Sequence, residues 1–220
     1  MGNTTPEWQF WMTWSVQVLS LGATFGAVLL ALFGQGFRAK FFPPEFSIKL
    51  LSQDGEKTPV RLLPQEGDIQ TERQGEARYY HLAVSNSRRW VTANHVEVVL
   101  LKIEDIGPDG QFKVAWSGAV PLKWRQQETI TGPRSIGPTA HADLCSIVKN
   151  KWVQLHPLYV PFNLNLIYRN AIRIRLTVQA RSLEADSAPV QVELSWDGQW
   201  HDGATEMASH LKINIKTLAG

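Results

Sequence analysis

Residues 82–100 read LAVSNSRRWVTANHVEVVL and contain two runs in which apolar side chains recur at every second position. The first run begins at Leu82 and Val84, and the second extends from Val96 to Leu100. Successive side chains of a β-strand point to opposite faces, so this period of two predicts two strands that each bury one face.

The same alternation recurs along most of the chain after residue 45. Further strands are predicted over residues 46–50, 112–116, 151–155, 171–180, 190–196 and 211–215. Aspartate-glycine pairs, which favour tight turns, interrupt these runs. The pairs are Asp54-Gly55, Asp109-Gly110, Asp197-Gly198 and Asp202-Gly203. Many short strands without long amphipathic helices predict an all-β fold, and we favour an antiparallel β-sandwich over a barrel.

Two segments of the opening stretch, Leu82–Asn86 and Ala93–Leu100, together follow the pattern L-x-V-x-N … A-x-x-V-x-V-x-L. This run resembles the immunoglobulin-like modules of bacterial surface and adaptor proteins. The resemblance covers about 20 of 220 residues and implies an immunoglobulin-like sandwich without implying an activity. Cys145 is the only cysteine, so the cysteine pair of antibody domains is absent. The predicted domain, residues 45–220, is longer than a minimal module, and insertions or a ninth strand are expected.

The N-terminal region has a different character, because thirty consecutive residues from Trp8 to Phe37 carry no formal charge. As an α-helix this stretch would extend about 45 Å, which exceeds a hydrocarbon core of roughly 30 Å. We therefore expect a single transmembrane helix over residues 8–37, preceded by a short tail over 1–7 and followed by a juxtamembrane linker over 38–44. Membrane-interface anchors are expected at Trp8, Trp11, Trp14, Arg38 and Lys40.

The orientation of this helix follows from where basic residues first occur. No lysine or arginine precedes Arg38, which argues against a cleaved signal peptide and favours a signal anchor. The positive-inside bias then places the C-terminal domain in the cytoplasm of a bacterial-type inner membrane, with a periplasmic domain as the alternative.

Two faces of the predicted helix suit contacts between helices. One carries polar or small residues at steps of three or four, including Gln17, Ser20 and Thr24. The opposite face carries Gly22 and Gly26, a G-x-x-x-G pair that permits close approach of two backbones. A homo-oligomer through this helix is one hypothesis, a plain anchor is another, and a water-lined pore is a third.

Composition limits the classes of partner. Removal of Glu7, Arg38 and Lys40 leaves 20 basic and 19 acidic residues, so we expect no nucleic-acid partner. The lone Cys145 excludes an intramolecular disulfide and favours a reducing compartment. The chain contains no G-x-S-x-G, Walker, H-E-x-x-H or paired C-x-x-C motif, and nothing in it points to a cofactor.

Two residue clusters are candidates for chemical sites. His141, Asp143 and Cys145 alternate and would share one face of a regular strand, where they could ligate zinc, although no fourth ligand is identifiable. A purely structural role is the competing interpretation. A second group could bring acid and base together on one helical turn. Its members are His201, Asp202, Glu206 and His210.

Two further features are candidates for partner contact. Arg173 and Arg175 alternate with apolar residues, and Arg169 lies just upstream. The three form either a solvated strand face or a site for an anion or an acidic partner. The stretch Leu158–Phe162 forms either a core strand with a turn or an exposed apolar loop.

These observations lead to three functional hypotheses. The preferred one is a single-pass, membrane-anchored, non-catalytic binding or adaptor protein whose cytoplasmic β-sandwich recognises a protein partner or ligand. The second is an oligomeric effector that perturbs the lipid bilayer, for example in stress or anti-phage defence, under control of the sandwich. The third is a membrane-tethered enzyme that uses the histidine and carboxylate clusters.

Overall fold

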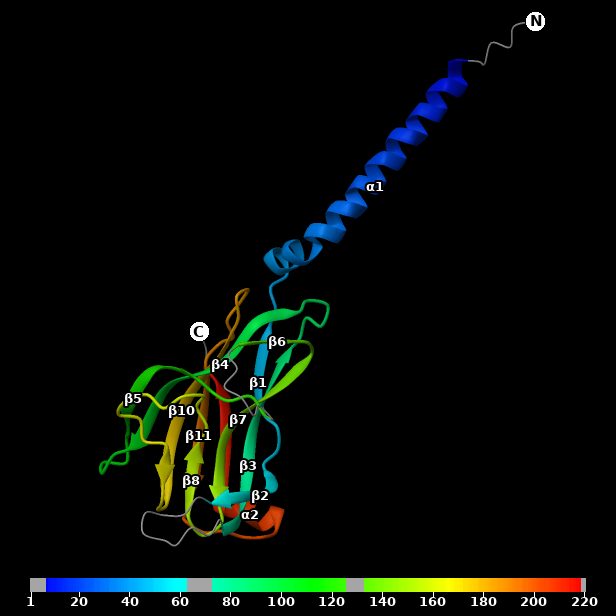
Figure 1. Cartoon of the computed structure of the whole chain (residues 1–220). Coiled ribbons are helices and arrows are strands. Elements are labelled where there is room, and N and C mark those ends of the chain that lie inside the picture. Colours follow the sequence, from blue (N-terminus) through cyan, green and yellow to red (C-terminus); the bar gives the residue numbers. More distant parts are fainter. Residues whose placement is uncertain (1–6, 63–72, 126–132, 219–220) are drawn as a thin grey trace, which may run out of the picture. The chain divides into compact units, whose positions relative to one another are not determined.

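The computed structural model describes residues 7–62, 73–125 and 133–218 (Figure 1). The chain divides into two compact units, Met1–Pro43 and Pro44–Gly220. The division falls between two consecutive prolines, which cannot donate the hydrogen bonds that would continue a helix. The chain thus has one helical unit and one unit built from β-strands.

The first unit consists of helix α1 (Glu7–Phe41), which is 35 residues long. It covers the helix predicted over residues 8–37 and extends into the predicted linker, because Pro43 is the first helix-breaking residue after that stretch. Among the residues that the structure describes, no helix combines the length and the apolar character needed to cross a membrane. The membrane span predicted for residues 8–37 is therefore not shown.

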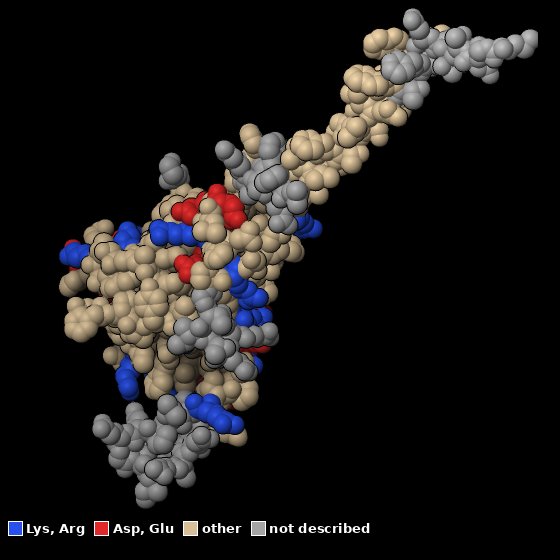
Figure 2. Space-filling view, turned by 45° about the horizontal axis from the view of Figure 1, so that its top comes forward, with Lys and Arg blue, Asp and Glu red and all other residues tan. Residues whose placement is uncertain are grey.

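Helix α1 exposes large apolar side chains, and the atoms described for it are tan in Figure 2 because they carry no charge. Eleven large side chains between Trp8 and Leu29 are 40–72% exposed. They are Trp8, Trp11, Met12, Trp14, Val16, Val18, Leu19, Leu21, Phe25, Val28 and Leu29. At 100° per residue they occupy roughly two thirds of the helix circumference. The remaining stripe contains Gln17, Ser20 and Thr24, while the side chains of Arg38 and Lys40 lie outside the described residues.

The second unit is a sandwich of two antiparallel sheets, each with six strands among the described residues (Figure 1). The first sheet has the order β1-β3-β7-β8-β9, and β2 also pairs with β3. Its strands are β1 (Phe46–Leu50), β2 (Glu56–Leu62), β3 (Arg73–Asn86), β7 (Thr139–Val148), β8 (Trp152–Leu155) and β9 (Ile167–Tyr168). The predicted all-β, two-sheet architecture is confirmed.

The second sheet has the order β12-β11-β10-β4-β5, and β6 also pairs with β4. Its strands are β4 (Ala93–Ile106), β5 (Phe112–Pro121), β6 (Arg134–Ile136), β10 (Ile172–Arg181), β11 (Val190–Trp196) and β12 (Leu211–Thr217). A short helix, α2 (Ala204–His210), connects β11 to β12. The segments Leu82–Asn86 and Ala93–Leu100 therefore lie in different sheets, on β3 and β4.

The core between the sheets follows the predicted alternation. Leu82 and Val84 of β3 and Val98 and Leu100 of β4 are at most 1% exposed. Burying a side chain of this size contributes about 1.5–3 kcal/mol relative to leaving it in water. The period of two in the opening stretch thus directs both strands into one core.

Three of the four predicted aspartate-glycine turns have the expected backbone. Gly55, Gly110 and Gly198 adopt positive φ values, which glycine tolerates without steric cost. Gly203 differs, because its φ of −71° is an extended conformation at the N-cap of α2. Asp202-Gly203 is thus the entry to a helix and not a hairpin turn.

Candidate functional site

Strand β7 carries the three candidate zinc ligands. His81 of β3 pairs with Asp143, but the preceding residue of β3 pairs with Cys145, so Leu144 is the extra residue of a β-bulge. His141 and Asp143 are partly exposed, whereas Cys145 is fully buried in the core. The prediction that the three share one face is therefore wrong for Cys145, because strict alternation holds only in a strand without a bulge.

The metal hypothesis gains no support from this arrangement. In the part of the chain that the structure describes, no group of three or more His, Cys, Asp or Glu side chains could hold a metal ion. Burial raises the pKa of the Cys145 thiol far above its ordinary value, so the sulfur stays protonated. A neutral buried thiol is a poor ligand and a poor nucleophile.

The same bulge brings Asp143 next to a residue that the sequence analysis did not single out, His81. The Nδ1 atom of His81 lies 2.8 Å from Oδ1 of Asp143. His81 is only 6% exposed, and its buried Nε2 atom makes no hydrogen bond. The nearest charged partner of Nε2 is Oε2 of Glu56, at 3.5 Å. A carboxylate at Nδ1 fixes the ring, so that Nε2 can accept or donate a hydrogen bond from this position.

A shallow hollow of about 260 Å³ lies over this pair on the outer face of the first sheet. Glu56 contributes to its rim and contacts the guanidinium of Arg125. The lining comes from β2, β3, β7 and the segment after β5, and consists of Glu56, Thr58, Pro59, Val60, Tyr79, His81, Arg125 and Asp143. In the sequence, the one sign of this site was a histidine, His81, at an outward position directly before Leu82. Alternation alone could not place Glu56 and Arg125 beside it.

A second imidazole lies nearby, beside a hydroxyl group that is buried. Nε2 of His156 is 2.8 Å from Oγ of Ser146, and Ser146 is only 2% exposed. Burial lowers the pKa of His156 to about 4, so its ring is neutral near pH 7. Tyr79 stacks on this ring with the centroids 5.4 Å apart. The hydroxyl is therefore enclosed, and the geometry favours a structural role for this pair.

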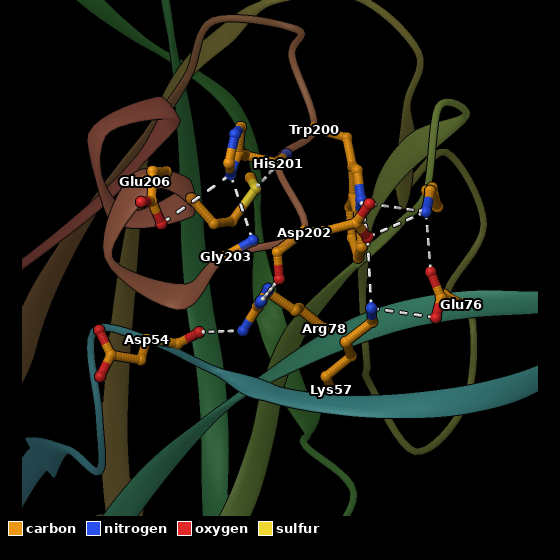
Figure 3. Close-up of polar contacts among 11 residues, drawn as sticks. Asp54, Lys57, Glu76, Arg78, Trp200, His201, Asp202, Gly203 and Glu206 are labelled. Atoms are coloured by element: carbon orange, nitrogen blue, oxygen red, sulfur yellow. Dashed lines mark hydrogen bonds and ion pairs between the residues drawn. The ribbon is translucent and has the colours of Figure 1, made fainter.

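At another place in the sandwich, Arg78 is buried with 4% exposure and holds two loops together. Its Nη1 atom donates to the carbonyl oxygen of Asp54 at 2.9 Å, and its Nη2 atom donates to the carbonyl oxygen of Asp202 at 2.6 Å. Figure 3 shows the guanidinium between these two segments. Arg78 thereby ties the chain before α2 to the first sheet.

Around Arg78, two lysines and two carboxylates form a network of ion pairs (Figure 3). Lys57 and Lys149 each contact both Glu76 and Asp202, at 2.9–3.2 Å. Hydrogen bonds from Lys149, Trp200 and Lys57 hold the pKa of Asp202 well below its usual range. Hydrogen bonds from Lys149 and Lys57 also lower the pKa of Glu76. The network therefore stays charged through neutral pH and serves to fasten the segment before α2.

The second predicted acid–base cluster comes together only in part, because the rings of His201 and His210 stack with their centroids 6.4 Å apart while Asp202 is bound elsewhere. Nδ1 of His201 lies 3.9 Å from Glu206, whereas Nδ1 of His210 lies 2.7 Å from Asp197. The carboxylate of Asp202 belongs to the lysine network. Glu206 and His210 are on α2 as expected, but each has a different partner, because the loops around α2 supply nearer ones.

The arginines predicted as an anion or partner contact are engaged within the fold. Arg173 and Arg175 point outward from β10 and lie 2.7 and 3.6 Å from the carboxylate of Glu193. The guanidinium of Arg175 also lies 3.8 Å from the ring centroid of Phe112. Arg169 lies over the ring of Trp152, at 5.4 Å. The outward orientation of the two β10 arginines agrees with the sequence, and their use by an external ligand stays a prediction.

Between the two interpretations of Leu158–Phe162, the structure gives an exposed apolar loop. Tyr159 and Val160 are more than half exposed, and Phe162 is 92% exposed. The loop is held to the end of β5 by the amide of Leu158, which donates to the carbonyl oxygen of Pro121 at 2.7 Å. The proline-containing stretch thus lies outside the core.

No protein-family model matches this chain, and no curated protein or solved structure is significantly similar to it.

Proposed function

We propose that this chain is a membrane-anchored, non-catalytic binding protein. In this proposal α1 is held in a lipid bilayer, the first basic residues after it keep the sandwich on the cytoplasmic side of a bacterial-type inner membrane, and the sandwich binds a partner. The immunoglobulin-like classification of the sandwich, suggested by the L-x-V-x-N pattern on β3, is part of the same proposal.

The observation that carries the proposal is the apolar surface of α1. Leu19 and Leu21 are more than 70% exposed in a helical unit that contains no other described element. Moving each such side chain out of water is favourable by about 1.5–3 kcal/mol, and the helix carries many of them. Leu30, Leu32 and Phe33 extend the uncharged run, although their side chains lie outside the described residues. Lipid would cover this surface without requiring a partner of matching shape.

A non-catalytic role for the sandwich rests on how its chemical groups are arranged. The thiol of Cys145 and the hydroxyl of Ser146 are enclosed. Around α2, Glu206 lies beside His201 and Asp197 beside His210, while the carboxylate of Asp202 is bound in the lysine network. His81 is the exception, since it lines a hollow and its Nε2 atom makes no hydrogen bond, and it is the residue to test for the enzyme alternative.

The test is extraction of the full-length chain from membranes with alkaline carbonate. The wild type should remain in the pellet and float with lipid in a density gradient. Leu21→Arg puts a charge into α1 and should shift much of the chain to the supernatant, because a charge in a membrane helix costs roughly 2.5–3.5 kcal/mol. Leu51→Arg is the matched control, since Leu51 is an exposed leucine of the sandwich unit, and it should stay in the pellet.

Release of the wild-type chain by carbonate would refute the anchor. The mass of the full-length chain in mild detergent distinguishes the oligomeric effector from the membrane-anchored binding protein. A monomer agrees with a plain anchor. A defined oligomer that is lost in Gln17→Leu and Gly26→Ile variants favours the bilayer-perturbing effector. A Cβ added at Gly26 would meet no atom of this chain within 4 Å, so the isoleucine can disturb only contacts with another helix.

A further inference from the structure

A groove of about 450 Å³ runs between the edge strands of the two sheets. One wall is the whole of β1, and the other is formed by β12 and the segment leading into β11. Its lining residues are Phe46, Ser47, Ile48, Lys49, Leu50, Ser187, Ala188, Val190, Ile215 and Thr217. The groove lies entirely within the sandwich unit. At about 3.3 Å per residue, its β1 wall is roughly 17 Å long.

The register of β1 leaves a row of backbone groups facing this groove. The amide of Ser87 donates to Glu45 and the amide of Leu51 donates to His81, so odd-numbered residues of β1 bond to β3. In an antiparallel pair the alternate residues direct their N–H and C=O groups to the other side. Phe46, Ile48 and Leu50 therefore present three donors and three acceptors along the free edge of β1.

The opposite wall follows the same rule. The amide of Leu218 donates to Pro189 on the β11 side, so odd-numbered residues of β12 direct their backbone groups toward the groove. One of these groups is already used, because Nε2 of Gln53 donates to the carbonyl oxygen of Ile213 at 2.7 Å. This bond joins the loop after β1 to β12.

Neither wall carries the irregularities that usually protect an edge strand. The pairings β1–β3 and β11–β12 contain no register shift, whereas β4–β5 at the other edge of its sheet contains two. At the corresponding position of β2, Pro59 removes an edge donor. The groove is thus bounded by two regular edges.

Two lysines border the groove. Lys49 of β1 is one of its lining residues, and Lys216 of β12 lies between the lining residues Ile215 and Thr217; both are exposed. Within the described residues neither forms an ion pair, in contrast to Lys57 and Lys149. The floor is apolar, because Ile48 and Val190 are buried beneath it. An occupant that complements this surface has apolar side chains facing inward and acidic side chains facing outward.

We infer that the groove binds an extended segment of a partner protein, which adds to β1 as an antiparallel strand with alternating apolar and acidic side chains. Every strand pair among the described residues is antiparallel, and backbone pairing at a free edge is an established mode of peptide recognition. This inference rests on the proposed binding function and specifies its partner, but it does not depend on the membrane anchor.

The test uses a fluorescent heptapeptide of alternating glutamate and valine, titrated against the purified full-length chain in mild detergent and followed by anisotropy. Saturable binding is expected, with amide exchange slowed at Phe46, Ile48 and Leu50. In the double variant Lys49→Glu/Lys216→Glu the dissociation constant should rise about three- to tenfold. Lys123→Glu/Lys151→Glu is the matched control, as both lysines are exposed on the sandwich and lie outside the groove lining, and should leave binding unchanged.

The backbone component is tested with methylated peptides. In an antiparallel strand added to β1, the inward-facing valines are the residues that bond to the edge. Methylation of the valine amides should therefore weaken binding roughly tenfold or more, whereas methylation of the glutamate amides should be tolerated.

Three results would overturn the inference: no saturable binding, equal binding of a lysine-valine peptide, or equal loss from both methylated peptides. A dimer of the chain that protects the same β1 amides without peptide would assign the edge to a second copy and also overturn it. A chain that leaves the membrane in carbonate but binds the peptide as expected would refute the anchor alone.

Discussion

The same residue type is exposed in helix α1 and buried in the β-sandwich. Leu21 of α1 is 71% exposed, whereas Leu82 of β3 is fully buried. In the sandwich, the apolar side chains of one sheet pack against those of the other sheet. The helical unit has no second described element that could cover the apolar side chains of α1. The difference teaches that the sandwich encloses its own apolar side chains, whereas the described part of α1 leaves many of its apolar side chains exposed.

The largest expected effect compares these two leucines directly. Leu82→Ala should lower the free energy of unfolding of the sandwich by about 2–5 kcal/mol, because it leaves a cavity in the core. Leu21→Ala removes the same atoms from an exposed position and should change that free energy by less than about 0.5 kcal/mol. Urea unfolding of the full-length chain in mild detergent, followed by tryptophan fluorescence, measures both. Equal losses in the two variants would show that α1 packs as part of the same core.

A smaller effect on the free energy of unfolding is expected at Arg78, a charged side chain that is buried in the sandwich. Arg78→Met leaves the carbonyl oxygens of Asp54 and Asp202 without their donor. Such unsatisfied groups cost about 1–3 kcal/mol in total stability. Arg89→Met changes an exposed arginine between β3 and β4 and should be nearly neutral. The two variants are compared by urea unfolding, and an equal response would mean that Arg78 does not fasten the segment before α2.

Much of the sandwich could be predicted because its signals are local. The alternation around Leu82 and Leu100 determines which side chains enter the core, whatever the rest of the chain does. The glycine turns at Gly55 and Gly198 depend only on the backbone freedom of one residue. Helix α1 could likewise be predicted from thirty uncharged residues. What covers its apolar side chains could not, because that depends on molecules outside the chain.

The candidate sites could not be predicted to the same extent because they depend on register. One additional residue in β7, Leu144, sends Cys145 into the core and brings Asp143 to His81. The contact between Glu56 and Arg125 joins segments 69 positions apart. The free edge of β1 is visible only when its hydrogen-bonding phase against β3 is known. These are long-range relations that no local pattern of residue types encodes.

The smallest expected effect concerns acid stability of the lysine network, and its sign follows from the pKa shifts. The pKa values of Asp202 and Glu76 are lowered from 3.8 and 4.5 in the folded chain. Their contribution is complete above these ordinary values and is lost as the pH falls toward the lowered ones. Lys149→Met removes one partner of both carboxylates and should therefore make the melting temperature less sensitive to acid.

The expected reduction in the difference between pH 7 and pH 3 is about 1–3 °C, because exposed ion pairs are weak. Lys123→Met, outside the network, should retain the wild-type difference. Calorimetry of the full-length chain in detergent measures these shifts. Helix α1 has no charged side chain between Trp8 and Phe37, so acid should act on the sandwich and leave the helical unit unchanged. Equal acid sensitivity in the wild type and Lys149→Met would mean that the network persists in the unfolded chain or contributes nothing to folding.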